Sequence, residues 1–177
     1  MNGAARIEKL HRGHKVEAFR CGRPERDRFL IRHALQAQFA NASQTYVAVR
    51  EDDVIGYCTF VVGQVERAGA PQRIAKGMPR HPIPLLVLAR LAAREDWQGR
   101  GVGAGLLRDA LGRTDQAADI AGVRALAVHA KDDGAAAFYR HFDFEPSPTD
   151  PRHLFLLVKD IRAATERPLA RTGRSGV

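Results

Sequence analysis

Hydrophobic and polar positions in the first third of the chain follow two different periods. In Pro24–Ala40 apolar residues recur every three or four positions, which is typical of an amphipathic helix with proline in its first turn. Two runs rich in β-branched and aromatic residues follow, Thr45–Arg50 and Val54–Val62, joined by an acidic turn. They predict a β-hairpin. Val16–Arg20 is a further candidate strand, and the polar residues 1–15 predict a frayed arm or a short edge strand.

The rest of the chain alternates short apolar runs with helical patterns. Gln64–Pro82 is polar and rich in proline, so we expect either a loop or an insert whose structure the pattern does not predict. The order of elements predicts a mixed α/β domain around one central sheet. We expect a single domain over residues 1–161 and a basic, disordered tail over residues 162–177. The predicted elements are a buried strand at Ile83–Ala93, a helix from Gly103 to Gly112 or on to Ala118, a strand at Val123–Ala130, a helix at Asp133–His141 and a strand at His153–Val158.

Composition narrows the class of protein. Hydrophobic residues make up 45% of the chain and charged residues 27%, as in globular domains, so a wholly disordered chain is excluded. The longest apolar stretch is too short to cross a bilayer, and the N-terminal residues lack the apolar core of a secretory signal. Cys21 and Cys58 form no metal-binding or disulfide pattern. We therefore expect reduced thiols, no metal and a cytoplasmic protein.

The charge balance points to a partner. Lys and Arg number 28 against 20 Asp and Glu, which gives a net charge of +8, and only five of the 28 are lysine. Arginine suits bidentate phosphate recognition, although a high-GC genome also favours arginine over lysine. Genome composition does not explain the excess of positive charge, which indicates a polyanionic partner.

A glycine-rich segment follows the predicted buried strand and opens a helix: Gln98-Gly99-Arg100-Gly101-Val102-Gly103. The start of a helix has free N–H groups and a positive dipole end, and glycines let the backbone approach a phosphate. A Walker loop needs a Gly-Lys-Ser/Thr ending, which is absent, and the Rossmann spacing does not fit. The segment predicts a site for a nucleotide-type pyrophosphate, with a tight strand-to-helix connection as the alternative.

A second candidate site lies in the predicted helix Asp133–His141. Its three successive alanines would let a cofactor lie against the helix. Tyr139 carries the chemistry, because a phenol with a pKa of about 10 can give a proton to a thiolate whose thiol has a pKa of about 8.5. The alternative is a half-buried aromatic residue with its hydroxyl in water. Phe138, Phe142 and Phe144 are most simply core residues.

These features together resemble the GCN5-related N-acetyltransferase (GNAT) family. Its motif for the pyrophosphate of an acyl-CoA, Gln/Arg-x-x-Gly-x-Gly/Ala, is matched by Gln98, Gly101 and Gly103. The resemblance implies a mostly antiparallel sheet flanked by helices, acetyl-CoA as acyl donor, and Tyr139 as the acid for the CoA thiolate. It also implies backbone contacts from the end of the preceding strand to the pantetheine arm. The expected cofactor-binding residues are Leu91, Ala92, Ala93, Gln98, Gly99, Arg100, Gly101, Val102, Gly103, Lys131, Asp132, Ala135, Ala136 and Phe138.

Within this family, residues 16–158 are most similar to the GNAT toxins of type II toxin–antitoxin modules, which acetylate the amino group of aminoacyl-tRNA. Ala93-Arg94 departs from the aliphatic residue and acid usual in this branch, and Asp143 departs from the usual Phe-Gly-Phe turn. The resemblance implies aminoacyl-tRNA and a ribbon-helix-helix antitoxin as partners, and a homodimer, without a membrane. The matching runs are Phe19-Arg-Cys-Gly, Thr45-Tyr-Val-Ala, Gly56-Tyr57, Pro84-x4-Ala89-Arg90-Leu91-Ala92, and Ala130-Lys131-Asp132 before Phe138-Tyr139.

The residues themselves agree with such an acceptor. No carboxylate lies in Ile83–Ala93 to act as a general base, and Glu95 and Asp96 are expected to face solvent. An α-amino group, with a pKa of about 8, needs less help than a lysine at about 10.4. His81 and His129 have no metal-spaced partner.

Other functions stay open. The acceptor is alternatively a small amine, which the basic surface would repel, or a protein N-terminus. A module that binds nucleic acid or CoA without catalysis is the remaining alternative. The basic residues expected around a tRNA acceptor end are Arg73, Lys76, Arg80, Arg90 and Arg94.

Overall fold

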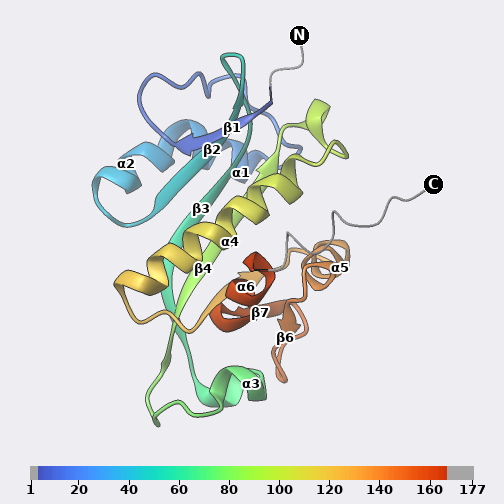
Figure 1. Ribbon diagram of the computed structural model, residues 1–177. Helices are drawn as coiled ribbons and strands as arrows, with labels where there is room; N and C mark the ends of the chain where they lie inside the picture. The colour runs from blue at the N-terminus through green and yellow to red at the C-terminus, as the bar shows by residue number, and fades with distance from the viewer. Residues whose placement is uncertain (1–3, 167–177) are drawn as a thin grey trace, which may run out of the picture. The chain divides into compact units, whose positions relative to one another are not determined.

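The computed structural model describes residues 4–166, whose contacts divide them into two compact units. The first unit contains residues 4–62 and 87–110, and the second contains residues 63–86 and 111–166. Seven strands form one sheet in the order β1-β2-β3-β4-β5-β7-β6 (Figure 1). The pairs β1–β2, β2–β3, β5–β7 and β6–β7 are antiparallel. The predicted α/β class with a mostly antiparallel sheet is therefore confirmed.

A hairpin and a broken helix build the core of the first unit. Strands β2 and β3 place Thr45 opposite Thr59, whose buried hydroxyl groups share a hydrogen bond of 2.8 Å. Phe19, Leu30 and Tyr57 are almost fully buried beside these strands. The elements are β1 (Arg6–Lys9), α1 (Pro24–Arg28), the π-helical η1 (Phe29–His33), α2 (Ala34–Phe39), β2 (Gln44–Arg50), the 3-10 helix η3 (Glu95–Trp97), and those that continue beyond the unit, β3 (Asp53–Val65), β4 (Ile83–Ala93) and α4 (Val102–Ile120).

Gly56 in β3 sets how closely the start of α4 packs against the sheet. A Cβ atom at Gly56 would lie 2.7 Å from the side chain of Val102, 2.9 Å from that of Leu106 and 3.1 Å from the carbonyl oxygen of Ala92. The first two distances are shorter than real Cβ contacts and the third is tight against the backbone, so a larger residue here would push Val102 and Leu106 away from the sheet. This close packing holds the first turns of α4, and the glycine-rich segment before them, against β3 and β4.

The second unit is organised around two paired strands. Strand β5 is buried from Ala125 to Val128, and it pairs with β7 so that Ala127 lies opposite Phe155. The side chain of Arg124 donates hydrogen bonds to the carbonyl groups of Arg73, Ile74 and Lys76, which anchors the short helix α3. The elements are the 3-10 helix η2 (Arg67–Gly69), α3 (Gln72–Ala75), β5 (Ala125–His129), α5 (Asp133–His141), β6 (Glu145–Pro146), β7 (His153–Leu157) and α6 (Val158–Thr165).

The structure corrects three predicted segments. Val16–Arg20 is not a strand but a turn, in which Phe19 N–H donates to the Val16 carbonyl over 3.0 Å and the Phe19 ring enters the core. Gln64–Pro82 is not a plain loop, because it holds η2 and α3 and buries Ile74. Helix α6 runs past residue 161 to Thr165, so part of the expected tail is helical. The remainder, residues 167–177, lies outside the described residues.

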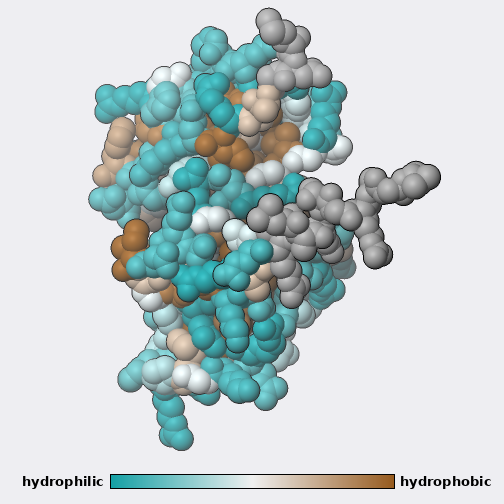
Figure 2. All heavy atoms as spheres, in the orientation of Figure 1, coloured by the Kyte–Doolittle hydropathy of each residue, from teal (hydrophilic) through white to brown (hydrophobic). Residues whose placement is uncertain are grey.

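Figure 2 shows hydrophilic residues over most of the visible face. Among residues 4–166, none of the helices is both long enough and apolar enough to cross a membrane. The large hydrophobic side chains that stay exposed are Phe39, Val62 and Ile120.

Candidate functional site

The glycine-rich segment forms an open cradle at the start of α4. Gly99 and Gly101 have φ angles of +75° and +84°, a backbone conformation that favours glycine. A Cβ atom on Gly99, Gly101, Gly103 or Gly105 would meet no described atom within 4 Å. The N–H groups at the start of a helix lack acceptors within the helix, and here Gly105 makes the first recorded bond, to the Gly101 carbonyl over 2.9 Å. Free amides beside open space suit a phosphate group.

The side chain of Gln98 makes hydrogen bonds to other groups of the protein and so holds this loop in place. Its side-chain amide donates to the carbonyl oxygens of Cys21 over 2.9 Å and of Ala93 over 3.0 Å. The side chain that the family motif assigns to cofactor binding is therefore a clamp that ties the loop to the end of β4. One of these hydrogen bonds reaches a residue 77 positions earlier in the chain, and the other reaches the last residue of β4. Together they fix the position at which the loop begins.

A cavity of about 450 Å³ lies beside the loop. This volume is in the range of ordinary small-molecule sites. The guanidinium groups of Arg50 and Arg100 lie over the ring of Trp97, with 5.0 Å and 5.1 Å between the guanidinium carbon and the ring centroid. Arg100 is thus oriented by Trp97 next to the loop amides. The sequence interpretation missed Trp97, because a single tryptophan in a polar turn has no periodic pattern. The lining includes Arg50, Ile55, Trp97, Arg100, Gly101 and Val102.

The end of β4, expected to contact a pantetheine arm, is held by an arginine that the sequence interpretation missed. Arg26 in α1 donates to the Leu91 carbonyl over 3.0 Å. The hydroxyl group of Tyr57 donates in turn to the Arg26 carbonyl over 2.9 Å, and burial raises the pKa of that phenol above its ordinary value. Of the three expected contacts, Ala92 is buried while Leu91 and Ala93 are partly exposed. No sequence signal connects Arg26 with Leu91, which lies 65 positions later.

Helix α5 of the second unit holds Tyr139. Asp132 caps this helix by accepting a hydrogen bond from Ala135 N–H over 2.8 Å, Lys131 is exposed, and Ala136 faces the interior. Tyr139 is 7% exposed, so it is more deeply buried than the half-buried aromatic residue of the alternative. Its centroid lies 5.2 Å from that of Phe138 and 5.5 Å from that of Phe144. Aromatic packing therefore fixes the direction of the phenol.

Asp143 keeps the turn that a glycine usually makes after this helix. Its φ angle is +69°, in the left-handed region that aspartate enters more readily than most residues. Asp143 N–H donates to the Arg140 carbonyl over 2.9 Å, and Phe144 N–H donates to the Tyr139 carbonyl over 3.2 Å. The departure from the Phe-Gly-Phe pattern thus leaves Phe144 in the core.

Two of the five predicted nucleic-acid-binding cations are paired with aspartates. Arg73 binds Asp160 through two hydrogen bonds of 2.7 and 2.9 Å, and Arg94 binds Asp96 in the same way over the same distances. These hydrogen bonds lower the pKa of both aspartates. Glu95 and Asp96 are exposed, as predicted. The positive charges of Arg73 and Arg94 are therefore compensated locally.

The remaining three cations differ from these. Lys76 and Arg80 are exposed, and within residues 4–166 neither pairs with a carboxylate. Arg90, on β4, is half-buried and lies over the ring of Phe29, with 3.6 Å from its guanidinium carbon to the ring centroid. Lys76, Arg80 and Arg90 are the members of the predicted set whose charge is not neutralised by a neighbouring acid.

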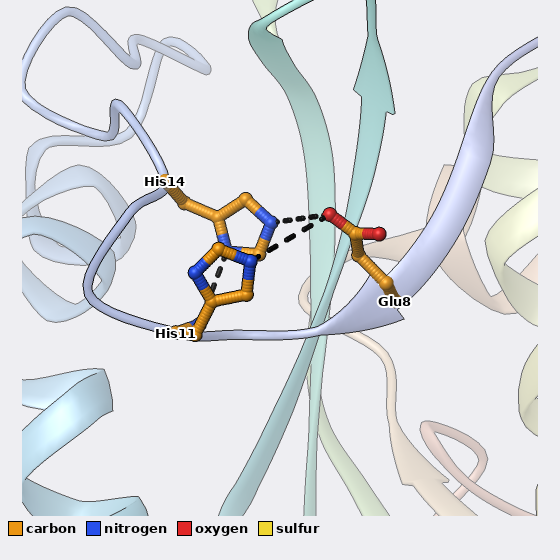
Figure 3. A group of neighbouring side chains, drawn as sticks. All are labelled: Glu8, His11 and His14. Carbon is orange, nitrogen blue, oxygen red and sulfur yellow. Dashed lines mark hydrogen bonds and ion pairs between the residues drawn. The ribbon is translucent and has the colours of Figure 1, made fainter.

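Glu8, His11 and His14 form a separate cluster at the end of β1 (Figure 3). Their potential ligand atoms lie within 4.8 Å of one another. The Nδ1 atom of His11 accepts Gly13 N–H, and the Nδ1 atom of His14 accepts His11 N–H, each over 3.0 Å. A neutral ring that accepts at Nδ1 carries its proton at Nε2, and His14 Nε2 lies 2.6 Å from Glu8. A metal at Nε2 would move the ring proton to Nδ1, which could then no longer accept the backbone N–H groups. The geometry therefore favours a set of hydrogen bonds that stabilises the turn.

The family model for an acetyltransferase (GNAT) domain matches residues 41–146, and the chain belongs to this family. The tRNA-acetylating toxin of Mycobacterium tuberculosis is 45% identical over 163 residues, which are 92% of this chain and 98% of that protein. The structure of AtaT complexed with acetyl-methionyl-tRNAfMet is similar with a TM-score of 0.84 and 28% identity, over 91% of this chain and 99% of that one. A mutant AtaT bound to the C-terminus of the antitoxin AtaR and acetyl-CoA has a TM-score of 0.78 and 25% identity, over 93% and 100%.

Proposed function

We propose that this protein is the toxin of a type II toxin–antitoxin system, and that it acetylates the amino group of aminoacyl-tRNA and so inhibits translation. The observation that carries the proposal is the open glycine cradle at the start of α4. It suits the pyrophosphate of acetyl-CoA, the acyl donor of the family. The acceptor follows from 45% identity, over nearly the whole chain, to a tRNA-acetylating toxin.

The chain's own residues take three roles toward the donor. The amides of residues 99–103 hold the pyrophosphate, and Arg100 adds positive charge. The backbone of Leu91, Ala92 and Ala93 binds the pantetheine arm. Bound acetyl-CoA supplies an acetyl group activated as a thioester. The Tyr139 hydroxyl gives its proton to the departing sulfur, while a C–N bond replaces the C–S bond. The acceptor nitrogen loses one proton to water, and Tyr139 regains its proton from water.

The acceptor amine needs no carboxylate base in this proposal. Glu95 and Asp96, the acids that follow β4, are exposed, and Asp96 is bound to Arg94. An aminoacyl amine, with a pKa of about 8, is partly neutral at physiological pH. The basic side chains Lys76, Arg80 and Arg90 attract the phosphates of the acceptor end.

The partners follow from the same basic residues. An acidic segment of a ribbon-helix-helix antitoxin would bind the residues that serve the tRNA, since both ligands are anionic. AtaT is a toxin that binds the C-terminus of its antitoxin AtaR. We further propose that the protein acts in the cytoplasm, where charged tRNA is used, and that it forms a homodimer, which sedimentation tests directly.

Labelled acetyl-CoA and total charged tRNA test the proposal. We expect label to appear in the aminoacyl group of one or a few tRNAs and to be absent when the tRNA is deacylated beforehand. Purified ribosomal proteins and a panel of small amines serve as competing acceptors in parallel reactions. Label on these, with none on charged tRNA, would replace the tRNA acceptor by a protein N-terminus or a small amine.

A further inference from the structure

Arg90 and Phe29 form a flat cationic platform next to the end of β4. The guanidinium carbon of Arg90 lies 3.6 Å from the ring centroid of Phe29, well within the range of a cation–π contact. At this distance the planar guanidinium lies against the ring, so one face is covered and the other faces away from it. Arg90 is half-buried, and within residues 4–166 no carboxylate is paired with it.

A closed chain of contacts within the first unit holds this platform. Phe29 stacks on Tyr57, with ring centroids 6.4 Å apart and 24° between the planes. Tyr57 donates to the Arg26 carbonyl, and Arg26 donates to the carbonyl of Leu91, the neighbour of Arg90 in β4. Two of the links are hydrogen bonds of 2.9 and 3.0 Å between buried or half-buried groups. The orientation of Arg90 is therefore set before any ligand binds.

The local helix geometry adds to this. Phe29 is the first residue of the π-helical segment η1, in which Ala34 N–H donates to the Phe29 carbonyl, five residues back. Such segments are rare and are frequent at functional sites. Here the π turn presents Phe29 to β4 while Leu30 and Ala34 stay in the core.

A charge that binds only a phosphate does not need a platform. Arg73 and Arg94 meet anions in the fork geometry, through two parallel hydrogen bonds to a carboxylate. Arg90 instead presents a plane, and unpaired RNA bases stack on arginine planes and aromatic rings. The aminoacyl group is carried by the unpaired end of a tRNA. Residue 90 directly precedes the expected pantetheine-binding residues Leu91–Ala93.

We infer that the guanidinium plane of Arg90 stacks on an unpaired nucleobase of the acceptor end, which makes Arg90 a specificity-determining residue for RNA. The inference rests on the proposed function. It assigns Phe29 a positioning role, because the ring acts only through Arg90. It also separates Arg90 from Lys76 and Arg80, which act by charge alone.

A coupling experiment between protein and RNA tests this. The probe is an uncharged acceptor-stem hairpin with its unpaired 3′ end, alongside three versions that each have one unpaired nucleotide abasic. Wild-type protein should bind one abasic version about 5- to 100-fold more weakly, the size of one stacked base. Arg90→Lys keeps the charge and loses the plane, so it should bind that version and the intact hairpin equally.

Two further variants complete the design. Phe29→Leu should reduce the base dependence as Arg90→Lys does, provided that its melting temperature and acetyl-CoA affinity match the wild type. Arg80→Lys makes the same chemical change at an exposed arginine and should keep the full base dependence. Salt dependence should be the same for wild type and Arg90→Lys, because the charge count is unchanged.

Base dependence that survives in Arg90→Lys would overturn the inference. So would equal weakening of all hairpins in Arg90→Gln with a salt slope lower by about 0.7, which is the signature of a phosphate contact. The assay needs no acetyl transfer. A protein that shows the coupling yet labels no charged tRNA would refute the proposed function alone, and one that labels charged tRNA without the coupling would refute this inference alone.

Discussion

The side-chain amide of Gln98 donates a hydrogen bond to the backbone carbonyl of Ala93 over 3.0 Å. It therefore joins the loop that precedes α4 to the last residue of β4. A second hydrogen bond from the same amide reaches Cys21. The loop backbone is thus positioned before any phosphate arrives, and little ordering is left to occur on binding.

Gln98→Met removes both donors without adding charge. We expect acetyl-CoA affinity to fall about 5- to 50-fold, since two intramolecular hydrogen bonds of about 1 kcal/mol each no longer hold the loop. Calorimetric titration measures the change. Gln72→Met makes the same substitution on an exposed residue of α3 and should leave affinity unchanged. Equal affinities in the wild type and Gln98→Met would show that the clamp does not shape the site.

Gly101→Val tests the cradle. Valine strains a backbone with a φ angle of +84° and fills the open space beside the loop amides. We expect acetyl-CoA affinity to fall more than about 100-fold, because charge-assisted hydrogen bonds contribute about 1.5–3 kcal/mol each. Gly77→Val is the matched control, because Gly77 has a φ angle of +77° and the same open surroundings outside the loop. It should lose stability but not binding. Similar affinities for the two variants would argue against the loop as the phosphate site.

Tyr139→Phe removes one hydroxyl group and keeps the ring between Phe138 and Phe144. We expect the rate of acetyl transfer to charged tRNA to fall about 10²- to 10⁴-fold, the usual contribution of a positioned acid. Acetyl-CoA affinity and melting temperature should stay close to those of the wild type. Tyr46→Phe, in β2, should retain full activity. Near-normal turnover of Tyr139→Phe would make Tyr139 a packing residue.

Asp160→Asn tests the ion pair between α6 and α3. The hydrogen bond from Arg73 lowers the pKa of Asp160 in the folded protein, so the unfolded chain binds its proton at higher pH. The stabilisation is therefore complete above the ordinary aspartate pKa of about 3.9 and is lost as pH falls through the lower folded value. We expect the variant to lose less than about 1 kcal/mol at pH 7, since solvent screens the pair, and almost nothing at pH 2.

Urea unfolding at the two pH values measures this difference. Asp52→Asn makes the same substitution in the exposed turn between β2 and β3, away from Arg73, and serves as the matched control. A loss of stability in Asp160→Asn that is the same at pH 2 and pH 7 would assign the effect to something other than the charge.

Cations paired with an acid and cations without such a partner are expected to contribute differently to RNA affinity. The double substitution Arg73→Met with Asp160→Met removes a compensated pair, so tRNA affinity and its salt dependence should not change. Lys76→Gln and Arg80→Gln remove uncompensated charges, and each should lower the slope of log affinity against log salt by about 0.7–0.9 if it contacts a phosphate. Filter binding over a range of salt concentrations measures the slopes. An unchanged slope in both single variants would place the tRNA elsewhere on the surface.

Sequence patterns predicted β4 and α5 to the residue, for clear physical reasons. Ile83–Ala93 is a long, mostly apolar run between Pro82 and Arg94, and Asp133–His141 follows an aspartate that caps it. Helix α6 was not predicted, because only Val158 and Ile161 of its residues are buried and the rest is polar. Val16–Arg20 was predicted as a strand because it contains apolar residues. In the structure it is a turn, and Phe19 packs into the core without any pairing to a neighbouring strand.

The residues of the candidate site also fall into two groups, those that the sequence predicted and those that it did not. The glycine loop and Tyr139 have local signatures, which a single sequence can reveal. The roles of Arg26, Trp97 and Gln98 depend on contacts between segments far apart in the chain, such as Arg26 with Leu91 and Arg50 with Trp97. The neutralisation of Arg73 by Asp160 is of this kind too. Spacing and composition contain no information on such pairs.

The π turn at Phe29–His33 makes this part of the chain sensitive to insertion and deletion. A π turn contains one more residue than an α turn, because its hydrogen bond joins residues five positions apart instead of four. Deleting the exposed Arg32 would allow an uninterrupted α-helix. Each residue advances a helix by about 100°, so the residues before the deletion would rotate relative to those after it. Phe29 could then reach β4 only if Ala34 left the core. The number of residues in this segment, as much as their identity, decides which aromatic ring lies beneath Arg90.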